Sequence, residues 1–244
     1  MLLSAPGARL GTGELVAMTL QIIIAVDGPA ASGKTTLARK LSERLGFELI
    51  ETGRYYRTVG FALRAAGWNL DDTDSLGRFI SDLSLPTLEA IPASEVAGED
   101  VARFGSRAAG YAATRDHVTA WVRARLARCQ DAGRGVVVEG RDAGTVACPH
   151  AWPKFYVIAD VRVRAERRAA QLGVIVPSPA YDTLLADLMA RDDADSTRVN
   201  SPLRKATDAI EIDTGSLGVD AALDRMLDHI ADRTRRPPRG ACVT

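Results

Sequence analysis

Short apolar runs alternate with stretches of helical periodicity along most of the chain. Each run has the length of a buried β-strand and is flanked by glycine or polar residues. The predicted strands are 22–26, 47–50, 135–138, 155–159 and 209–212. Apolar residues that recur every three or four positions predict helices over 33–45, 54–65, 117–129, 162–172, 181–190 and 219–230.

This alternation is typical of a parallel sheet, because parallel strands need a crossover connection that is usually a helix. Strands that are apolar throughout must be covered on both faces. The sequence therefore predicts an α/β fold with a five-stranded parallel sheet and helices on both faces. Ligands of such sheets bind beyond the carboxyl ends of the strands, so polar motifs directly after a strand are the first candidates for a site.

Two segments fit the alternation poorly. Residues 71–115 mix prolines and acidic residues with only weak periodicity, and residues 174–200 begin with a proline-interrupted turn and continue as a charged helix. We expect both to be mobile covers over the site. The segment before Met18 has no periodicity, so we expect residues 1–18 to be a disordered extension or sequence upstream of the true start. A core domain over 19–232 and a loose basic tail over 233–244 complete the predicted organisation.

Composition excludes several classes of partner. The 31 basic and 31 acidic residues cancel, so no overall field favours nucleic acid or an anionic membrane. No apolar run reaches the ~18 residues that span a bilayer. Three cysteines without metal-ligand spacing indicate reduced thiols in a cytoplasmic protein, and we expect no bound structural metal.

A complete phosphate-loop (P-loop) pattern lies between the first predicted strand and the first predicted helix. Glycines let the backbone turn tightly toward phosphate oxygens, the helix adds its positive end, and the lysine adds a mobile charge. A hydroxyl after the lysine can help to hold Mg²⁺. The chain is therefore predicted to bind ATP with Mg²⁺. The nucleotide-binding residues are Gly28, Pro29, Ala30, Ala31, Ser32, Gly33, Lys34, Thr35 and Thr36.

Three further motifs carry arginines. Residues 51–57 follow the second predicted strand, residues 139–145 follow the third, and residues 191–198 lie in the second cover. Phosphoryl transfer between two nucleotides needs such groups, because donor and acceptor phosphates repel each other and must be aligned. Arginine suits this task because its planar fork engages two phosphate oxygens.

The order of these four motifs resembles that of the bacterial cytidylate kinases, in the nucleoside monophosphate kinase group. The resemblance runs from about residue 22 to residue 230. It rests on residues 27–34, on Thr52-Gly53 with Tyr56-Arg57, on 140–142 with 144–146, and on 191–192 with Arg198. Residues 201–203 and 206–209 also follow the family pattern.

The resemblance implies a P-loop NTPase fold, a mobile lid and an acceptor-nucleotide insert that is short over 83–101. The implied activity is phosphorylation of CMP and dCMP by ATP, in pyrimidine nucleotide metabolism, by a cytoplasmic monomer. Lys34, Arg191 and Arg198 would act on the transferring group. The substrate-binding residues implied are Thr52, Arg57, Ser106, Arg115, Arg141, Asp142, Arg191 and Asp195.

Within that set, Arg57 and Arg141 would bind the acceptor phosphate, and Ser106 and Arg115 would contact the pyrimidine. The resemblance assigns the exocyclic amine to Asp142, and the chemistry agrees. A carboxylate accepts from the N4 amine of cytosine but repels O4 of uracil.

Other readings stay open. A different small-molecule or nucleotide kinase would share the P-loop. A GTPase-like switch would need an Asn-Lys-x-Asp motif, but Leu70 and Ser201 follow the only two asparagines. A binding module without catalysis would not need Lys34, Arg141, Arg191 and Arg198 together.

Overall fold

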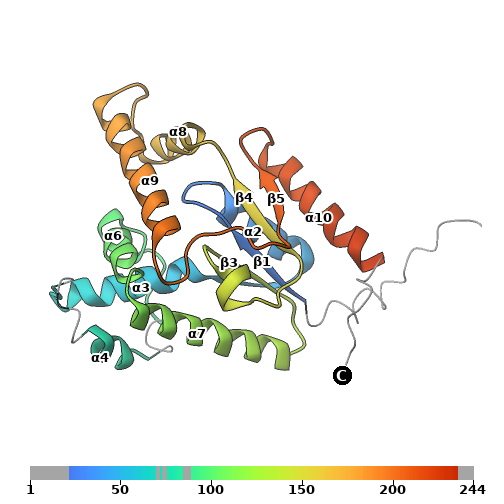
Figure 1. Ribbon diagram of the computed structural model, residues 1–244, viewed down its shortest axis with the longest axis horizontal. Helices are drawn as coiled ribbons and strands as arrows, with labels where there is room; N and C mark the ends of the chain where they lie inside the picture. The colour runs from blue at the N-terminus through green and yellow to red at the C-terminus, as the bar shows by residue number, and fades with distance from the viewer. Residues whose placement is uncertain (1–21, 70–71, 73–75, 85–88, 236–244) are drawn as a thin grey trace, which may run out of the picture.

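The computed structural model describes residues 22–69, 72, 76–84 and 89–235. They contain a five-stranded sheet in the order β2-β3-β1-β4-β5, in which every neighbouring pair is parallel (Figure 1). The strands are β1 Ile23–Asp27, β2 Glu48–Glu51, β3 Val136–Gly140, β4 Lys154–Ile158 and β5 Ile210–Asp213. All five predicted strands and the predicted parallel pairing are confirmed, with ends shifted by one or two residues.

Eight α-helices and one π-helical turn, η1, belong to the described residues. They are α2 Lys34–Leu45, α3 Thr52–Ala65, α4 Leu76–Ser81, α6 Glu99–Ala108, α7 Ala112–Asp131, η1 Ala143–Ala147, α8 Val161–Leu172, α9 Pro179–Thr197 and α10 Val219–Arg235. The six predicted helices are confirmed, whereas α4, α6 and η1 were not predicted. Helix α7 begins at Ala112 rather than at the predicted 117, which places Arg115 in its first turn.

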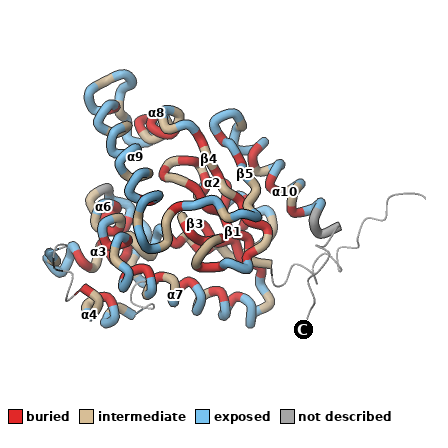
Figure 2. Tube along the Cα trace, viewed as in Figure 1, coloured by how far each residue is buried: buried red, intermediate tan, exposed pale blue. Residues whose placement is uncertain are grey.

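The two faces of the sheet bury separate cores. Successive strand residues point to opposite faces, so Ile24 and Val26 pack with residues of α2 and α10, including Leu37 and Met226. Ala25, between them, belongs to the core formed with α3 and α7. Figure 2 shows the strands buried along their length, whereas much of α9 is exposed. The prediction of helices on both faces is confirmed.

Helices α8 and α9 form a third group at the carboxyl end of the sheet (Figure 1). Ala165 of α8 and Leu188 of α9 pack with Ala30 of the P-loop. Helix α9 starts where Ser178 accepts a hydrogen bond from the Tyr181 amide at 3.2 Å, with Pro179 in the first turn. The charged helix predicted within 174–200 is therefore present and packs against the loop that it was expected to cover.

Helices α3 and α6 cross at two glycines. A Cβ on Gly60 would lie 2.4 Å from the Gly105 nitrogen, and a Cβ on Gly105 would lie 2.6 Å from the carbonyl oxygen of Tyr56. This backbone contact brings α6 directly against α3, and Val101, Ala102 and Ala108 form the buried stripe of α6. In the described part of 71–115 the regular structure is helical: α4, α6 and the start of α7.

The chain ends differ in how far they are described. Residues 1–18, which we expect to be a disordered extension, lie outside the described residues. Residues 236–244 also lie outside them. Helix α10 continues to Arg235, so the predicted basic tail does not begin at 233. The helix can continue there because the first proline is Pro237.

Candidate active site

The P-loop joins the carboxyl end of β1 to the amino end of α2, as the motif predicts. Gly28 has a φ of +154°, and a Cβ there would lie 2.1 Å from the carbonyl oxygen of Val157, so only glycine fits. Gly33 and Ala31 also have positive φ angles, +86° and +58°. Backbone turns of this kind form concavities that bind anions. The loop has the geometry of a phosphate cradle at the positive end of α2.

Two carbonyl oxygens of the loop are held from outside it. Buried Arg164 on α8 donates from Nη1 to the Ala30 oxygen at 3.1 Å. Thr214, just after β5, donates from its hydroxyl to the Ser32 oxygen at 2.8 Å, and Arg167 donates to that hydroxyl at 2.9 Å. The carbonyl oxygens of Ala30 and Ser32 would repel phosphate. These contacts satisfy both oxygens with donors from outside the loop. Arg164 and Arg167 were not among the predicted site residues, because they belong to none of the four motifs.

Lys34, the first residue of α2, is buried within the loop. Its Nζ donates to the Pro29 oxygen at 3.1 Å and lies 3.4 Å from Oε1 of Glu139 at the end of β3. Thr35 donates from its hydroxyl to the same carboxylate oxygen at 3.3 Å. Glu139 was not among the predicted site residues. The signal in the sequence was a charged residue in an otherwise apolar strand.

Lys34, Arg141 and Arg191 lie close enough to disfavour one another's charge. Burial, followed by the charge of Arg141, lowers the pKa of Lys34 to about 7. The same two causes lower the pKa of Arg191 to about 10, and Arg57 contributes as well. The Nε of Arg191 is buried without a hydrogen-bond partner in the described part of the chain. A group of cations held together in this way is suited to a polyanion.

Asp195, near the end of α9, joins two of the predicted arginines. Its Oδ2 accepts from Arg141 Nε at 3.2 Å, and its Oδ1 accepts from Arg198 Nη1 at 2.9 Å. Arg198 also donates from Nε to the Ser201 oxygen at 2.6 Å. Helix α9 is thereby connected to the loop after β3. One side chain thus holds Arg141 and Arg198 near the position where phosphate is expected.

Arg115 and Asp142 form a buried ion pair beside this cluster. Arg115 Nη1 lies 3.1 Å from Asp142 Oδ2 and donates to the Tyr56 hydroxyl at 3.4 Å. The guanidinium carbon of Arg115 also lies 5.4 Å from the centre of the Tyr56 ring. The structure therefore brings the predicted base-reading residues Arg115 and Asp142 together from α7 and the loop after β3. It adds Tyr56, which the motifs contain but to which they assign no role of its own.

The remaining predicted residues lie at the edges of this arrangement. Thr52 is buried at the start of α3, and a Cβ on Gly140 would come within 2.7 Å of its hydroxyl oxygen. Ser106 is half-buried on α6, one residue after the glycine that touches Tyr56. Thr36 is exposed on α2. The individual roles of these residues stay predictions.

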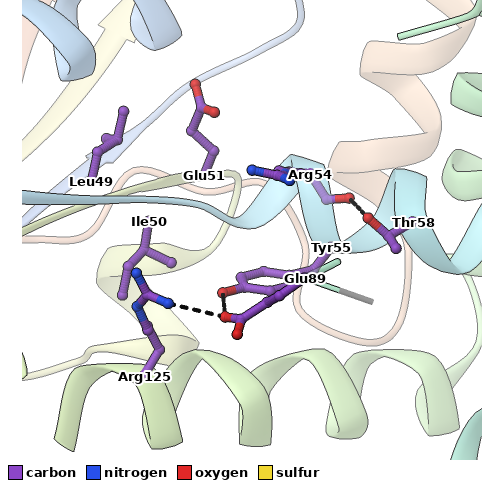
Figure 3. Close-up of a pocket in the computed structure, with 8 residues that line it drawn as sticks. All are labelled: Leu49, Ile50, Glu51, Arg54, Tyr55, Thr58, Glu89 and Arg125. Atoms are coloured by element: carbon purple, nitrogen blue, oxygen red, sulfur yellow. Dashed lines mark hydrogen bonds and ion pairs between the residues drawn. The ribbon is translucent and has the colours of Figure 1, made fainter. Parts of the chain in front are cut away.

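A cavity of about 220 Å³ lies elsewhere, between β2, α3 and α7 (Figure 3). Its charged groups all have partners: Glu51 pairs with Arg39, outside the lining, at 3.0 Å, and Arg54 donates to the Ile91 carbonyl oxygen at 3.2 Å. Glu89 accepts from the Tyr55 hydroxyl at 3.4 Å and from Arg125 at 3.1 Å. The predicted site residues lie outside its lining. The lining residues are Leu49, Ile50, Glu51, Arg54, Tyr55, Thr58, Glu89 and Arg125.

Comparison with known proteins agrees with the geometry. The profile of the family described as cytidylate kinase matches residues 24–232. The chain belongs to the cytidylate kinase family. A cytidylate kinase of Paramagnetospirillum magneticum is 39% identical over 214 residues, which cover 88% of this chain and 100% of that protein. A cytidylate kinase of Caulobacter vibrioides is 40% identical over 218 residues, covering 88% and 97%.

Membership of the cytidylate kinase family confirms the predicted resemblance and the enzyme class, a P-loop phosphotransferase. The solved structure of TT1252 from Thermus thermophilus is a weaker likeness, with a TM-score of 0.49 and 18% identity over 87% of this chain and 97% of that one. Among the described residues, no helix has the length and apolar character needed to span a bilayer.

Proposed function

We propose that this protein transfers the γ-phosphoryl group of ATP to CMP and dCMP, forming ADP and CDP or dCDP. The Arg115–Asp142 pair carries the proposal, because it places a buried carboxylate beside the arginine cluster. The P-loop explains the donor, and this carboxylate explains the choice of acceptor. The matching relatives are cytidylate kinases, which supports this acceptor over that of another small-molecule or nucleotide kinase.

Base selection follows from the chemistry of Asp142. Its carboxylate would accept a hydrogen bond from the N4 amine of cytosine, whereas O4 of uracil would leave two acceptors facing each other. An unsatisfied buried acceptor costs about 1–3 kcal/mol. Arg115 and Ser106 would donate to the acceptor atoms of the pyrimidine. Before substrate binds, Arg115 keeps the Asp142 charge paired.

Phosphoryl transfer needs alignment rather than a protein nucleophile. The acceptor phosphate would lie between Arg57 and Arg141, and the triphosphate would lie in the P-loop next to Lys34. A phosphate oxygen of CMP attacks the γ-phosphorus, the bond from this phosphorus to the β–γ bridging oxygen breaks, and ADP leaves with that electron pair. Arg191 and Arg198 would neutralise the charge that shifts during transfer.

Thr35 and Glu139 are the residues that would hold Mg²⁺. Their oxygens approach to 3.3 Å at the end of the phosphate cradle, and hydroxyl and carboxylate oxygens are ligands that Mg²⁺ prefers. When bound, the ion would neutralise phosphate charge. Glu139 also lies next to Lys34, where its charge is balanced in the absence of a metal ion.

The test is an assay of ADP formation with CMP, dCMP, UMP and AMP as acceptors. We expect kcat/KM for CMP and dCMP to exceed that for UMP by roughly tenfold or more. Comparable turnover of AMP would favour a different nucleotide kinase. Absence of transfer to every monophosphate would reject the proposal.

We further propose that the enzyme acts as a monomer in the cytoplasm. The contacts among Arg141, Asp195 and Arg198, and between Arg115 and Asp142, all lie within one chain, which supports a site that does not need a second copy. Light scattering at assay concentration would give the mass of a single 26.1 kDa chain. Activity that rises more steeply than enzyme concentration would contradict this.

A further inference from the structure

Asp27 connects the two loops of the site, although it was not among the predicted site residues. It is the last residue of β1 and directly precedes the P-loop. Its Oδ1 accepts from the Ala143 amide at 2.8 Å, and its Oδ2 accepts from the Gly144 amide at 2.7 Å. Those two residues begin η1, the turn that immediately follows Asp142. A single carboxylate therefore spans from the donor loop to the loop that carries the base-reading residue.

This carboxylate is held in unfavourable surroundings. It is 5% exposed, and burial raises its pKa to about 6, partly offset by the Gly144 and Ala143 amides. The nearby carboxylates of Asp142 and Glu139 disfavour its charge further. A buried anion destabilises a fold unless its hydrogen bonds compensate. Positions where a fold keeps such a group are enriched in functional roles.

The glycines of the turn also lie close to Asp27 and its neighbours. A Cβ on Gly144 would come within 3.3 Å of Asp27 Oδ2 and 3.1 Å of Lys154 Cδ. A Cβ on Gly140 would lie 3.5 Å from Asp27 Oδ1. Each of the two amide donors is matched to one oxygen of the carboxylate. Arg123 donates to the later carbonyl oxygens of η1, at Val146 and Ala147, whereas Asp27 holds the first two amides of the turn, directly after Asp142.

We propose that Asp27 is a positioning residue that fixes the turn after Asp142 and thereby aims the Asp142 carboxylate at the acceptor base. The proposal rests on the proposed function, since it concerns selection of CMP. Asp27 governs binding and choice of the acceptor, whereas the donor cradle depends on Gly28, Gly33 and Lys34.

Asp27→Asn tests the proposal at nearly constant volume. The amide has one acceptor oxygen, and its NH₂ group faces a backbone donor, so one of the two hydrogen bonds is lost. We expect KM for CMP to rise about tenfold and the preference for CMP over UMP to fall by a similar factor. We expect KM for ATP to stay within about twofold of wild type.

The control is Asp160→Asn. Asp160 is exposed and accepts from the Arg162 amide at 2.8 Å, as a helix cap that asparagine replaces well. Its kinetics should match wild type. If Asp27→Asn does not fold, Gly144→Ala crowds the contact between the same turn and Asp27, because its Cβ would lie 3.3 Å from Asp27 Oδ2, and it should lower the preference for CMP over UMP.

The outcomes are distinct. An equal rise in KM for ATP and CMP in Asp27→Asn, with base preference retained, would overturn the inference and give Asp27 a role in the P-loop. If Asp27→Asn folds and prefers CMP over UMP as strongly as wild type does, the inference is also overturned. If Asp27→Asn does not fold, the same result in Gly144→Ala overturns the inference. A wild-type enzyme that does not phosphorylate CMP would instead reject the proposed function.

Discussion

Two clusters of charged side chains, the P-loop site and the open edge of β2, differ in how their charges are balanced. At the edge, Arg125 lies 3.1 Å from Glu89 and 3.7 Å from Glu48, and Arg134 pairs with Glu48. These edge arginines each have a carboxylate beside them. In the site, Lys34 and Arg141 also have carboxylates beside them, Glu139 and Asp195, but Lys34, Arg141 and Arg191 lie close enough to disfavour one another's charge.

The pKa values show the same difference. Partial burial alone would lower the pKa of Arg125, but the charge of Glu89 raises it above its ordinary value. In the site, burial and neighbouring arginines lower the pKa of Lys34 and of Arg191. A cavity therefore does not identify the functional site in this chain. The functional site is identified instead by like charges that the fold keeps together, because a bound polyanion relieves their repulsion.

Lys34→Ala should have the largest effect. The variant removes the buried cation that would lie between the terminal phosphates, so we expect kcat to fall by about a hundred- to a thousandfold. Circular dichroism should show an intact fold. A folded variant with near-normal turnover would remove the basis for assigning the P-loop as the donor site.

Arg141→Lys should come next. The charge is retained but the bidentate geometry is lost, so kcat/KM for CMP should fall by roughly ten- to a hundredfold. Steady-state kinetics at saturating ATP would measure this. Unchanged CMP kinetics would mean that Arg141 does not contact the acceptor.

The affinity for MgATP should depend on pH through Lys34. The free group has a pKa of about 7, and bound phosphates favour its charged form, so binding should take up a proton near neutral pH. As pH rises from about 7 to about 8.5, Kd should increase several-fold, because the free lysine is increasingly neutral. Calorimetry in two buffers of different ionisation enthalpy would measure the uptake. Lys34→Arg, which stays charged, should remove the dependence; a wild-type Kd that is constant over this range would contradict the expectation.

Arg125→Ala should have the smallest effect and serves as the matched change at the edge. Ion pairs near the surface contribute about 0–1 kcal/mol, which corresponds to a fall in Tm of at most about 4 °C for a chain of this size. We expect kcat/KM to stay within about twofold of wild type. A fall in kcat/KM comparable to that of Arg141→Lys would show that the charged cluster at the β2 edge takes part in catalysis. The edge cluster and the P-loop site would then not differ in function.

Much of this molecule follows from local pattern. The five strands and six of the helices were predictable because apolar periodicity reports which face of an element is buried. The P-loop was predictable because its glycines are needed for local backbone geometry, as the φ of +154° at Gly28 shows. Helix α6 was missed although Val101, Ala102 and Ala108 recur at helical spacing. Its place against α3 was not predictable, because it depends on the backbone contact between Gly60 and Gly105, which are far apart in the sequence.

The sequence by itself determined the fold class and the P-loop, and it predicted a set of arginines for the acceptor site. Only the tertiary structure showed Glu139 beside Lys34, Arg164 holding Ala30, and Asp27 holding the turn after Asp142. The partners in each pair are distant along the chain, and each is a polar group whose role depends on what the fold places next to it. Periodicity predicts that a residue is buried, but it cannot predict which distant backbone group its charge will meet.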